Sequence, residues 1–338
     1  SCPEFTLSVY PTSIPVSMEL TRRGISAQML ADGAVIKPSF CGPCFGAGDV
    51  PANNGLSLRH TTRNFPNREG SKPGEGQISY VALMDARSIA ATATHGGIIT
   101  AATDAEYSFT PTEYHYDHSA YAKRVYNGYG HAMPETELQL GPNITDWPKQ
   151  FPMGENVLLK LAAVLRDPVT TTDELIPSGE TSSYRSNPIR LSEFALSRRE
   201  PQYVSRSKAT AALEAARRAG DLSEEVKNVL ALFGDAEKLA ADTQIGSCLF
   251  AEKPGDGSAR EQAASCQKVL GGLGNICHAF ATKRYRSNCI NWGILPFTLD
   301  ETESFPYGVN DYIFVPHVKA GLLAGQTVFP ATVVCADG

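Results

Sequence analysis

The hydrophobic and polar positions of the chain follow two different patterns. A continuous apolar run over residues 157–165 is typical of a strand buried on both faces of a sheet. Residues 208–219 have the spacing of an amphipathic helix, and Ser223 is placed to cap the helix that follows. The other predicted elements are helices over 16–20, 27–30, 80–93 and 260–270, and strands over 34–36, 294–299, 312–315 and 327–335. This mixture of helices and strands predicts an α/β fold.

Between residues 106 and 150 the periodicity is lost, and Tyr, His, Pro and Asn are frequent. Segments of this kind usually run over the surface and connect more regular parts of a protein. A chain of 338 residues is also long for one hydrophobic core and suits about two domains of roughly 150 residues each. We therefore predict a first domain over residues 1–105, a linker over 106–150 and a second α/β domain over 151–338.

Composition narrows the class of protein further. Hydrophobic residues make up 42% of the chain, yet no apolar run approaches the roughly 18–20 residues that a membrane-spanning helix requires. The net charge of −6 argues against a dedicated nucleic-acid surface, which normally carries an excess of Lys and Arg. The eight cysteines lack the spacing of a secreted disulfide framework, and no secretion signal is visible. These features predict a cytoplasmic protein with reduced thiols, without a membrane or nucleic-acid partner.

Cys41 and Cys44 form the sequence Cys-Gly-Pro-Cys and are the clearest chemical signal in the chain. Two thiolates three residues apart can hold one soft metal centre. A tetrahedral zinc ion needs four ligands and an iron–sulfur cluster usually takes four thiolates, but the sequence contains no second pair of this kind. The remaining ligands therefore come from distant residues, or the centre keeps one position open. A buried structural pair of cysteines is the alternative.

Two arginine-containing clusters have side chains suited to binding anions. Arg63 and Arg68 lie five residues apart in a polar segment and could grip carboxylates, although loop arginines are more often solvated. Asp173 follows a run of threonines and precedes Arg185. That second pattern could form part of a binding site, and it equally fits helix capping with a surface ion pair.

Ser258 lies in the glycine-rich segment Gly255-Asp256-Gly257-Ser258, which runs into the predicted helix at Arg260. Backbone amides at the start of such a helix attract anions, so a hydroxyl group there could be activated as a base. The alternative is that Ser258 only caps the helix. Neither a Gly-x-Ser-x-Gly elbow nor a phosphate-binding loop is present, so the sequence supports neither a hydrolase triad nor nucleotide binding.

Taken in order, these motifs resemble the aconitase superfamily of iron–sulfur hydro-lyases. The resemblance rests on Cys41-Gly-Pro-Cys44, Arg63-Asn-Phe with Arg68, Thr171-Thr-Asp173 with Arg185, Gly257-Ser-Ala-Arg-Glu261 and Gly293-Ile-Leu-Pro-Phe297. It extends over nearly the whole chain but matches only the back portion of the family's architecture. It implies the end of an aconitase-like α/β cluster-binding domain, a linker and an α/β swivel domain.

The resemblance implies a [4Fe-4S] cluster held by three cysteines, with one open iron that binds the substrate. Cys41 and Cys44 match two of these ligands, and the third is expected upstream of this chain, in the N-terminal part of the same enzyme. Ser258 matches the family's catalytic base, and Asp173 matches an active-site carboxylate. The family's substrate-binding arginines are matched by Arg63, Arg68, Arg185 and Arg260.

The activity that the resemblance implies is reversible hydration of a di- or tricarboxylic hydroxy acid, of the citrate and isocitrate type or the 2-methylcitrate type. Two departures separate the chain from aconitase itself, because Thr62 stands where the family often has Asn and Ala259 replaces a Ser. The family's front domains, which carry further acid and base residues, are not matched, so we expect the isolated chain to be an incomplete enzyme. The alternatives are a non-catalytic homologue that senses RNA or a metabolite, and an inactive homologue.

Overall fold

The computed structural model of the chain describes residues 5–40, 49, 51–61, 76, 78–107, 112–177, 179 and 181–336. The chain divides into two compact units, Ser1–Glu135 (unit 1) and Thr136–Gly338 (unit 2). The boundary between the units falls inside the segment that the sequence predicts as a linker, while the predicted limits of the domains stay a prediction. In the described ranges, no helix is long and apolar enough to span a membrane.

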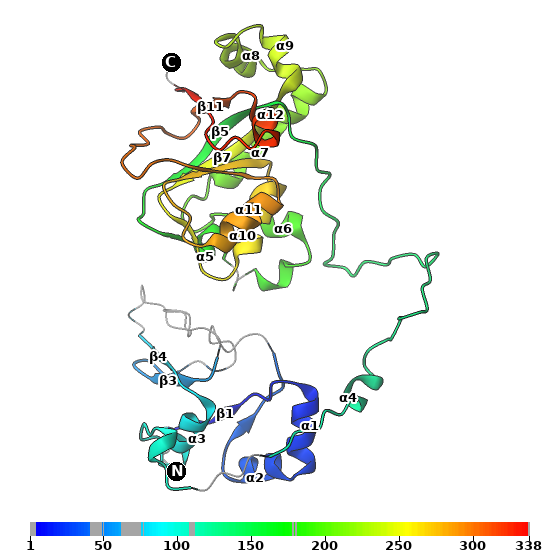
Figure 1. Cartoon of the computed structure of the whole chain (residues 1–338), viewed down its shortest axis with the longest axis vertical. Coiled ribbons are helices and arrows are strands. Elements are labelled where there is room, and N and C mark those ends of the chain that lie inside the picture. Colours follow the sequence, from blue (N-terminus) through cyan, green and yellow to red (C-terminus); the bar gives the residue numbers. More distant parts are fainter. Residues whose placement is uncertain are drawn as a thin grey trace. The chain divides into compact units, whose positions relative to one another are not determined.

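Unit 1 combines short helices with small parallel sheets (Figure 1). One sheet pairs β1 (Ser8–Val9) with β2 (Val35–Ile36), and another pairs β3 (Leu56–Arg59) with β4 (Tyr80–Leu83). Its helices are α1 (Ile14–Arg22), α2 (Ile25–Ala31), α3 (Ala86–Thr94) and α4 (Ser119–Ala122), with a 3₁₀ helix at Ala102–Asp104. Unit 1 is therefore α/β, with two strands in each of its sheets as far as the structure describes them.

The β3–β4 sheet of unit 1 is poorly covered. Leu56, Tyr80 and Leu83 are 51%, 55% and 47% exposed. Parallel sheets in proteins are normally covered on both faces, so that their strands are buried. The described part of unit 1 therefore leaves the apolar side chains of these two strands in contact with water.

Unit 2 is built on a six-stranded sheet with the strand order β10-β9-β7-β5-β11-β12. The first four of these strands are parallel to one another, whereas β11 runs antiparallel to both β5 and β12. The strands are β5 (Asn156–Leu165), β7 (Thr243–Ala251), β9 (Gly272–Cys277), β10 (Leu295–Thr298), β11 (Tyr312–Val315) and β12 (Thr332–Val334). The carboxyl ends of the four parallel strands therefore meet at one edge of the sheet, and the α/β fold predicted from the sequence is confirmed.

Helices pack on the sheet of unit 2 and at its two ends. Residues of α6, α7, α10 and α11 contribute to the hydrophobic cluster on one face of the sheet. The cluster on the other face includes Val318, in α12, and Phe305, in the segment between β10 and β11. Figure 1 shows α8 and α9 at one end of unit 2 and α5 at the opposite end. The helices are α5 (Thr172–Leu175), α6 (Pro188–Ser192), α7 (Tyr203–Arg218), α8 (Glu224–Ala231), α9 (Ala236–Asp242), α10 (Arg260–Val269), α11 (Lys283–Asn291) and α12 (Val318–Leu323), with a 3₁₀ helix at Ser182–Tyr184.

Strand β5 shows why a continuous apolar run becomes a buried strand. Leu159 belongs to the cluster that includes α12, whereas Leu158, the next residue along, packs in the cluster formed by α8 and α9. Towards the end of the strand, Leu165 joins the cluster of α7 and α10. Successive side chains of a strand point to opposite faces of the sheet, and both faces are covered here, so the apolar side chains of β5 are buried on either face.

The structure confirms part of the predicted elements and corrects others. The strands predicted over 157–165 and 312–315 are confirmed as β5 and β11. The helix predicted over 80–93 is wrong in its first part, because Tyr80–Leu83 form β4 and Asp85 caps a helix that begins later. The central strands β7 and β9 were not predicted from the sequence.

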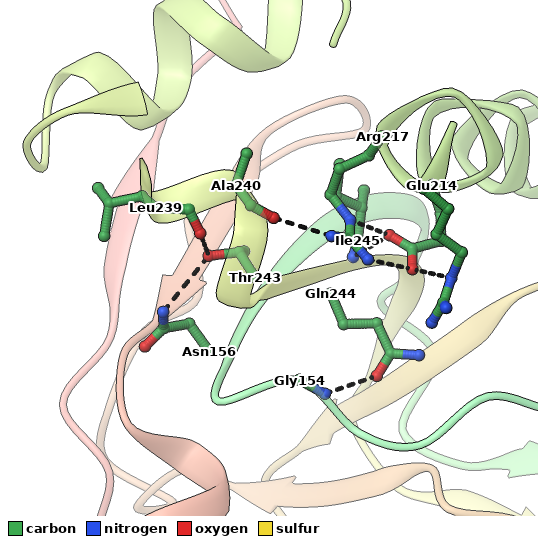
Figure 2. A network of polar contacts seen from close by, with 10 residues as sticks. Gly154, Asn156, Glu214, Arg217, Leu239, Ala240, Thr243, Gln244 and Ile245 are labelled. Atoms are coloured by element: carbon green, nitrogen blue, oxygen red, sulfur yellow. Dashed lines mark hydrogen bonds and ion pairs between the residues drawn. The ribbon is translucent and has the colours of Figure 1, made fainter. Parts of the chain in front are cut away.

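A network of polar contacts joins α7 to the amino ends of β5 and β7 (Figure 2). The Glu214 carboxylate accepts hydrogen bonds from the backbone N–H of Ile245 at 2.9 Å and from the Arg217 guanidinium at 2.7 and 2.8 Å. Arg217 also donates to the carbonyl of Ala240 at 2.8 Å, near the end of α9. The other members of this amino-terminal network are Gly154, Asn156, Arg218, Leu239, Thr243 and Gln244. The polar groups at this edge therefore hold helices and strands together.

Candidate functional site

The two motifs that contain Asp173 and Ser258 lie side by side in unit 2. Strand β6 (Thr170–Thr171) follows β5 and pairs in parallel with β8 (Pro254–Asp256), which follows β7. Because β5 and β7 are neighbours in the sheet, their carboxyl ends deliver both motifs to the same edge. The crevice at the carboxyl ends of parallel strands is the usual place for a ligand in open α/β sheets. This edge of unit 2 is therefore the candidate site.

Two glycines allow the Ser258 segment to approach its neighbours closely. Gly257 has a φ of +122°, and a Cβ atom there would lie 2.4 Å from the hydroxyl oxygen of Thr172. Gly255 has a φ of +97°, and a Cβ atom there would lie 2.3 Å from the ring of Tyr285. The backbone conformation and the contact both exclude a larger side chain. The glycine-rich sequence thus fixes the Ser258 segment against α5 and α11.

Ser258 does not cap the helix that follows it. Helix α10 begins at Arg260, its N-cap residue is Ala259, and no side chain makes a capping hydrogen bond there. Ser258 is partly buried, and its hydroxyl group has no hydrogen-bond partner among the described residues. The alternative that Ser258 is only an N-cap is therefore wrong, while its role as a base stays a prediction.

The turn before α5 shows the capping that the sequence left open as an alternative. The Thr171 hydroxyl accepts a hydrogen bond from the backbone N–H of Glu174 at 3.2 Å, and the Glu174 carboxylate accepts one from the backbone N–H of Thr171 at 2.7 Å. Asp173 accepts a hydrogen bond from the Arg198 guanidinium at 2.7 Å, and these side chains are 24% and 44% exposed. Asp173 thus forms an ion pair with Arg198, and not with Arg185, the arginine that follows it in the sequence motif.

Arg198 and Arg199 are charged neighbours of the site that the sequence reasoning missed. They lie in the turns before α7, and Arg199 pairs with Asp167 and, at 3.3 Å, with Glu174. Their sequence signal was a pair of adjacent arginines without periodicity, which is more typical of a solvated surface. The two guanidinium groups bring positive charge to the turn that contains Asp173.

The structure places the two predicted arginines of unit 2 differently. Arg260 is the first residue of α10 and is partly buried, so it lies at the same helix start as Ser258. Arg185 follows the 3₁₀ helix between α5 and α6, is exposed, and makes no hydrogen bond or ion pair with any described residue. Arg260 therefore belongs to the Ser258 segment, and the roles of both arginines in substrate binding stay predictions.

The predicted site residues of unit 1 lie outside the described residues: they are Cys41, Cys44, Arg63 and Arg68. Their proposed contacts with a cluster and a substrate therefore stay predictions. The described cysteines of unit 2 offer a test of whether another set of thiols fits a cluster better.

Four of the cysteines of unit 2 are core residues, because Cys248, Cys266, Cys277 and Cys289 are all buried. Burial raises the pKa of Cys277 to about 12 and that of Cys289 to about 11. Burial also raises the pKa values of Cys248 and Cys266 well above the usual range of a thiol. Within the described ranges, no group of three or more His, Cys, Asp or Glu residues could hold a metal ion.

Comparison with known proteins gives a family model, curated relatives and a solved structure that match parts of the chain. Residues 2–91, which include the predicted residues of unit 1, match the model of the aconitase family (aconitate hydratase). The 3-isopropylmalate dehydratase large subunit of Thermoanaerobacter pseudethanolicus is 30% identical over 89 residues, which are 26% of this chain and 21% of that protein. The 3-isopropylmalate dehydratase large subunit 2 of Methanopyrus kandleri is 32% identical over 74 residues, 22% of this chain and 18% of that protein. The chain thus spans about a fifth of the length of the curated relatives that it matches.

Among solved structures, a 3-isopropylmalate dehydratase of Methanocaldococcus jannaschii matches 53% of this chain and 83% of that chain, with 17% identity and a TM-score of 0.29. A TM-score this low does not establish a common fold. The family model matches residues 2–91, and the curated relatives match 89 and 74 residues of the chain. Together they confirm the resemblance of the chain to the aconitase superfamily.

Proposed function

We propose that this chain is a C-terminal part of an aconitase-like hydro-lyase that reversibly hydrates and dehydrates a di- or tricarboxylic hydroxy acid. The observation that carries the proposal is the pairing of β6 with β8, which brings the Asp173 turn and the Ser258 segment to one edge of a sheet. The curated relatives are named dehydratases, which supports a hydro-lyase. The candidate substrates are acids of the citrate and isocitrate type, acids of the 2-methylcitrate type and, from the names of the relatives, 3-isopropylmalate.

Such a reaction needs a base that removes a proton next to a carboxylate, and positive groups that neutralise this carboxylate. Ser258 is the candidate base. A free hydroxyl group is a very weak base, so its alkoxide needs positive surroundings, which the start of α10 and the guanidinium of Arg260 supply. Arg185 is exposed and could grip a second carboxylate with its planar fork of donors. Asp173 is the candidate carboxylate on the facing turn.

The proposal includes a [4Fe-4S] cluster with Cys41 and Cys44 as two of its ligands and a third cysteine in an upstream part of the enzyme. When bound, such a cluster supplies a Lewis acid for the departing hydroxyl group. The match of residues 2–91, which include Cys41 and Cys44, to the aconitase family model supports this pair. Arg63 and Arg68 are proposed to add to the carboxylate-binding residues.

The exposed strands of unit 1 support an upstream partner. Leu56, Tyr80 and Leu83 are about half exposed on strands that are normally buried, and a further part of the cluster-binding domain packed on β3 and β4 would cover them. On this basis, residues 1–105 are the end of the cluster-binding domain, 106–150 a linker and 151–338 the swivel domain. The free buried cysteines support a cytoplasmic location.

The test is an assay of the enzyme completed with its upstream part and reconstituted with iron and sulfide. We expect iron-dependent turnover of cis-aconitate, 2-methyl-cis-aconitate or 3-isopropylmalate, and no turnover by the 338-residue chain alone. Cys41→Ser should abolish both turnover and the visible absorption of the cluster, whereas Cys335→Ser, which changes an exposed cysteine, should leave both unchanged. Absence of turnover on all three acids by a cluster-loaded enzyme would refute the proposed function.

A further inference from the structure

His278 makes two hydrogen bonds that join three connections at the carboxyl edge of the sheet. It directly follows β9, and its Nδ1 lies 2.6 Å from a carboxylate oxygen of Glu252, the first residue after β7. Its Nε2 lies 2.8 Å from the backbone carbonyl oxygen of Glu303, in the segment between β10 and β11. Because β7, β9 and β10 are adjacent in the sheet, one imidazole ring ties together the segments that follow all three strands.

Both partners of His278 are oxygen acceptors, so the full pair of hydrogen bonds requires a proton on each ring nitrogen. That form is the imidazolium cation. The hydrogen bond to the Glu303 carbonyl, followed by that to the Glu252 carboxylate, raises the pKa of His278 above its ordinary value. The side chain of His278 is only 16% exposed, so it is held in place rather than solvated.

The charges around His278 are mostly negative. The segment after β10 contributes Asp300, Glu301 and Glu303, and Glu301 raises the pKa of His278 further through its charge. Two cations act on residues next to His278. The imidazole makes an edge-on contact with the ring of Phe250 at a centroid distance of 5.6 Å, and the guanidinium of Arg166, after β5, lies over the same ring. Burial raises the pKa of the neighbouring Cys277, and the charge of Arg286, in α11, acts to lower it.

The segment fastened by His278 is the one that leads to Ser258. Beyond His278, the backbone N–H of Ala281 donates to the carbonyl of Pro254 at 2.9 Å, and the Thr282 hydroxyl donates to the carbonyl of Gly255 at 2.9 Å. Residues 278–282 therefore run along residues 252–255 and hold them at both ends. The glycine-rich turn and Ser258 follow directly in the chain.

We propose that protonated His278 is a positioning residue that clamps residues 252–258 and the segment 299–305 to the end of β9, and that the clamp opens as the pH rises. The clamp exists independently of the proposed function, while its effect on Ser258 rests on that function. Because the pKa of His278 is raised in the folded state, the stabilisation is complete below the ordinary histidine pKa of about 6.5 and is lost as the pH rises through the raised value.

The test uses the complete 338-residue chain and needs no enzyme activity, so it separates this proposal from the proposed function. Titration of the histidine imidazole signals by NMR should give His278 a pKa above the ordinary histidine value of about 6.5. Glu252→Gln removes the charge but keeps a hydrogen-bond acceptor, and it should lower the pKa of His278. A pKa of His278 at or below about 6.5 in the unchanged chain would overturn the proposal.

Hydrogen exchange measured by mass spectrometry reports the opening directly. At about pH 6, His278→Gln should speed exchange of the amides of 252–258 and 299–305 at least about tenfold, the scale of one lost hydrogen bond to a charged group. At about pH 9 the difference between His278→Gln and the unchanged chain should become small. His317→Gln is the matched control and should change neither segment. If His278→Gln fails to fold, Glu252→Gln carries the same test, and unchanged exchange at 252–258 in the folded variant contradicts the clamp.

Discussion

The two edges of the sheet in unit 2 differ in how completely their buried polar groups are paired. At the amino edge, the carboxylate of Glu214 accepts hydrogen bonds from Arg217, Arg218 and the backbone of Ile245, and both Glu214 and Arg217 are almost buried, at 13% and 11% exposure (Figure 2). At the carboxyl edge, the buried hydroxyl oxygens of Thr170 and Thr172 have no hydrogen-bond partner among the described residues. The carboxyl edge therefore combines paired groups, such as His278, with unpaired buried hydroxyls.

This difference points to the carboxyl edge as the place where polar groups are kept for chemistry. An unpaired buried hydroxyl costs about 1–3 kcal/mol, and glycines with positive φ are needed where the backbone approaches its neighbours closely. Sequences keep such costs mainly where the arrangement serves a function. We therefore expect substitutions in the amino-terminal network to change the free energy of unfolding, and substitutions of the partly exposed polar groups Asp173 and Ser258 at the carboxyl edge to change turnover.

The two tryptophans of the chain make this expectation measurable. Trp147 and Trp292 both belong to unit 2, and their ring centroids lie 4.5 Å apart. Their fluorescence therefore reports unfolding of unit 2 without a contribution from tryptophan in unit 1. Urea denaturation followed by this signal gives the free energies that the first three predictions concern.

The largest loss of stability is expected for Gly255→Ala. A Cβ atom at this position would lie 2.3 Å from the ring of the buried Tyr285, and the φ of +97° disfavours any side chain. We expect a loss of at least about 3 kcal/mol, combining overpacking with backbone strain. Gly220→Ala is the control, because φ is +79° there but nothing lies within 4 Å, so it should lose only about 1–2 kcal/mol. Equal losses for both variants would mean that the close packing against α11 contributes nothing.

Glu214→Ala tests the amino-terminal network. It leaves the backbone N–H of Ile245 and the guanidinium of Arg217 without their shared acceptor, so we expect a loss of about 2–3 kcal/mol. The control is Glu224→Ala, because Glu224 is 82% exposed and its ion pair with Lys227 lies on the surface, where solvent screens the attraction, so its loss should be clearly smaller. A loss for Glu214→Ala no larger than for the control would remove the contrast between the two edges.

Asp173→Asn tests whether the ion pair at the carboxyl edge is structural. Asp173 and Arg198 are partly exposed, so solvent screens their attraction, and the loss of stability should stay below about 1 kcal/mol. In the completed enzyme, the same substitution should lower kcat clearly if Asp173 is an active-site carboxylate. A loss above about 2 kcal/mol with unchanged kcat would assign Asp173 to the structural framework instead.

The sequence predicted β5 but missed the strands beside it for a packing reason. Strands β7 and β9 contain Gly246 and Gly274, which are unfavourable in the interior of a strand and conceal its pattern. In the structure, a Cβ atom at Gly246 would lie 2.3 Å from Leu273, and one at Gly274 would lie 2.9 Å from Leu159. Close packing against side chains of other strands therefore requires these glycines, and such contacts are not visible in a local pattern.

The candidate site was predictable in its residue types but not in its pairings. The glycine-rich segment before Ser258 pointed to a helix start, and α10 begins within two residues of it. The partner of Asp173 could not be predicted, because Arg198 is distant in the sequence. The chain after α6 packs back on α5, where the backbone N–H of Leu196 donates to the carbonyl of Leu175, and this contact brings Arg198 to Asp173. Similarly, only the pairing of β6 with β8 shows that the two motifs share one edge.

The most direct measurement compares Ser258→Ala with Ser223→Ala in the completed enzyme. Ser223 is a true N-cap that accepts a hydrogen bond from the backbone N–H of Val226, so its loss should cost about 1 kcal/mol of stability and leave kcat unchanged. Ser258 caps no helix, so Ser258→Ala should leave the melting temperature nearly unchanged and lower kcat at least about 10²-fold, the scale of a lost general base. A near-normal kcat for Ser258→Ala would contradict the assignment of chemistry to the carboxyl edge.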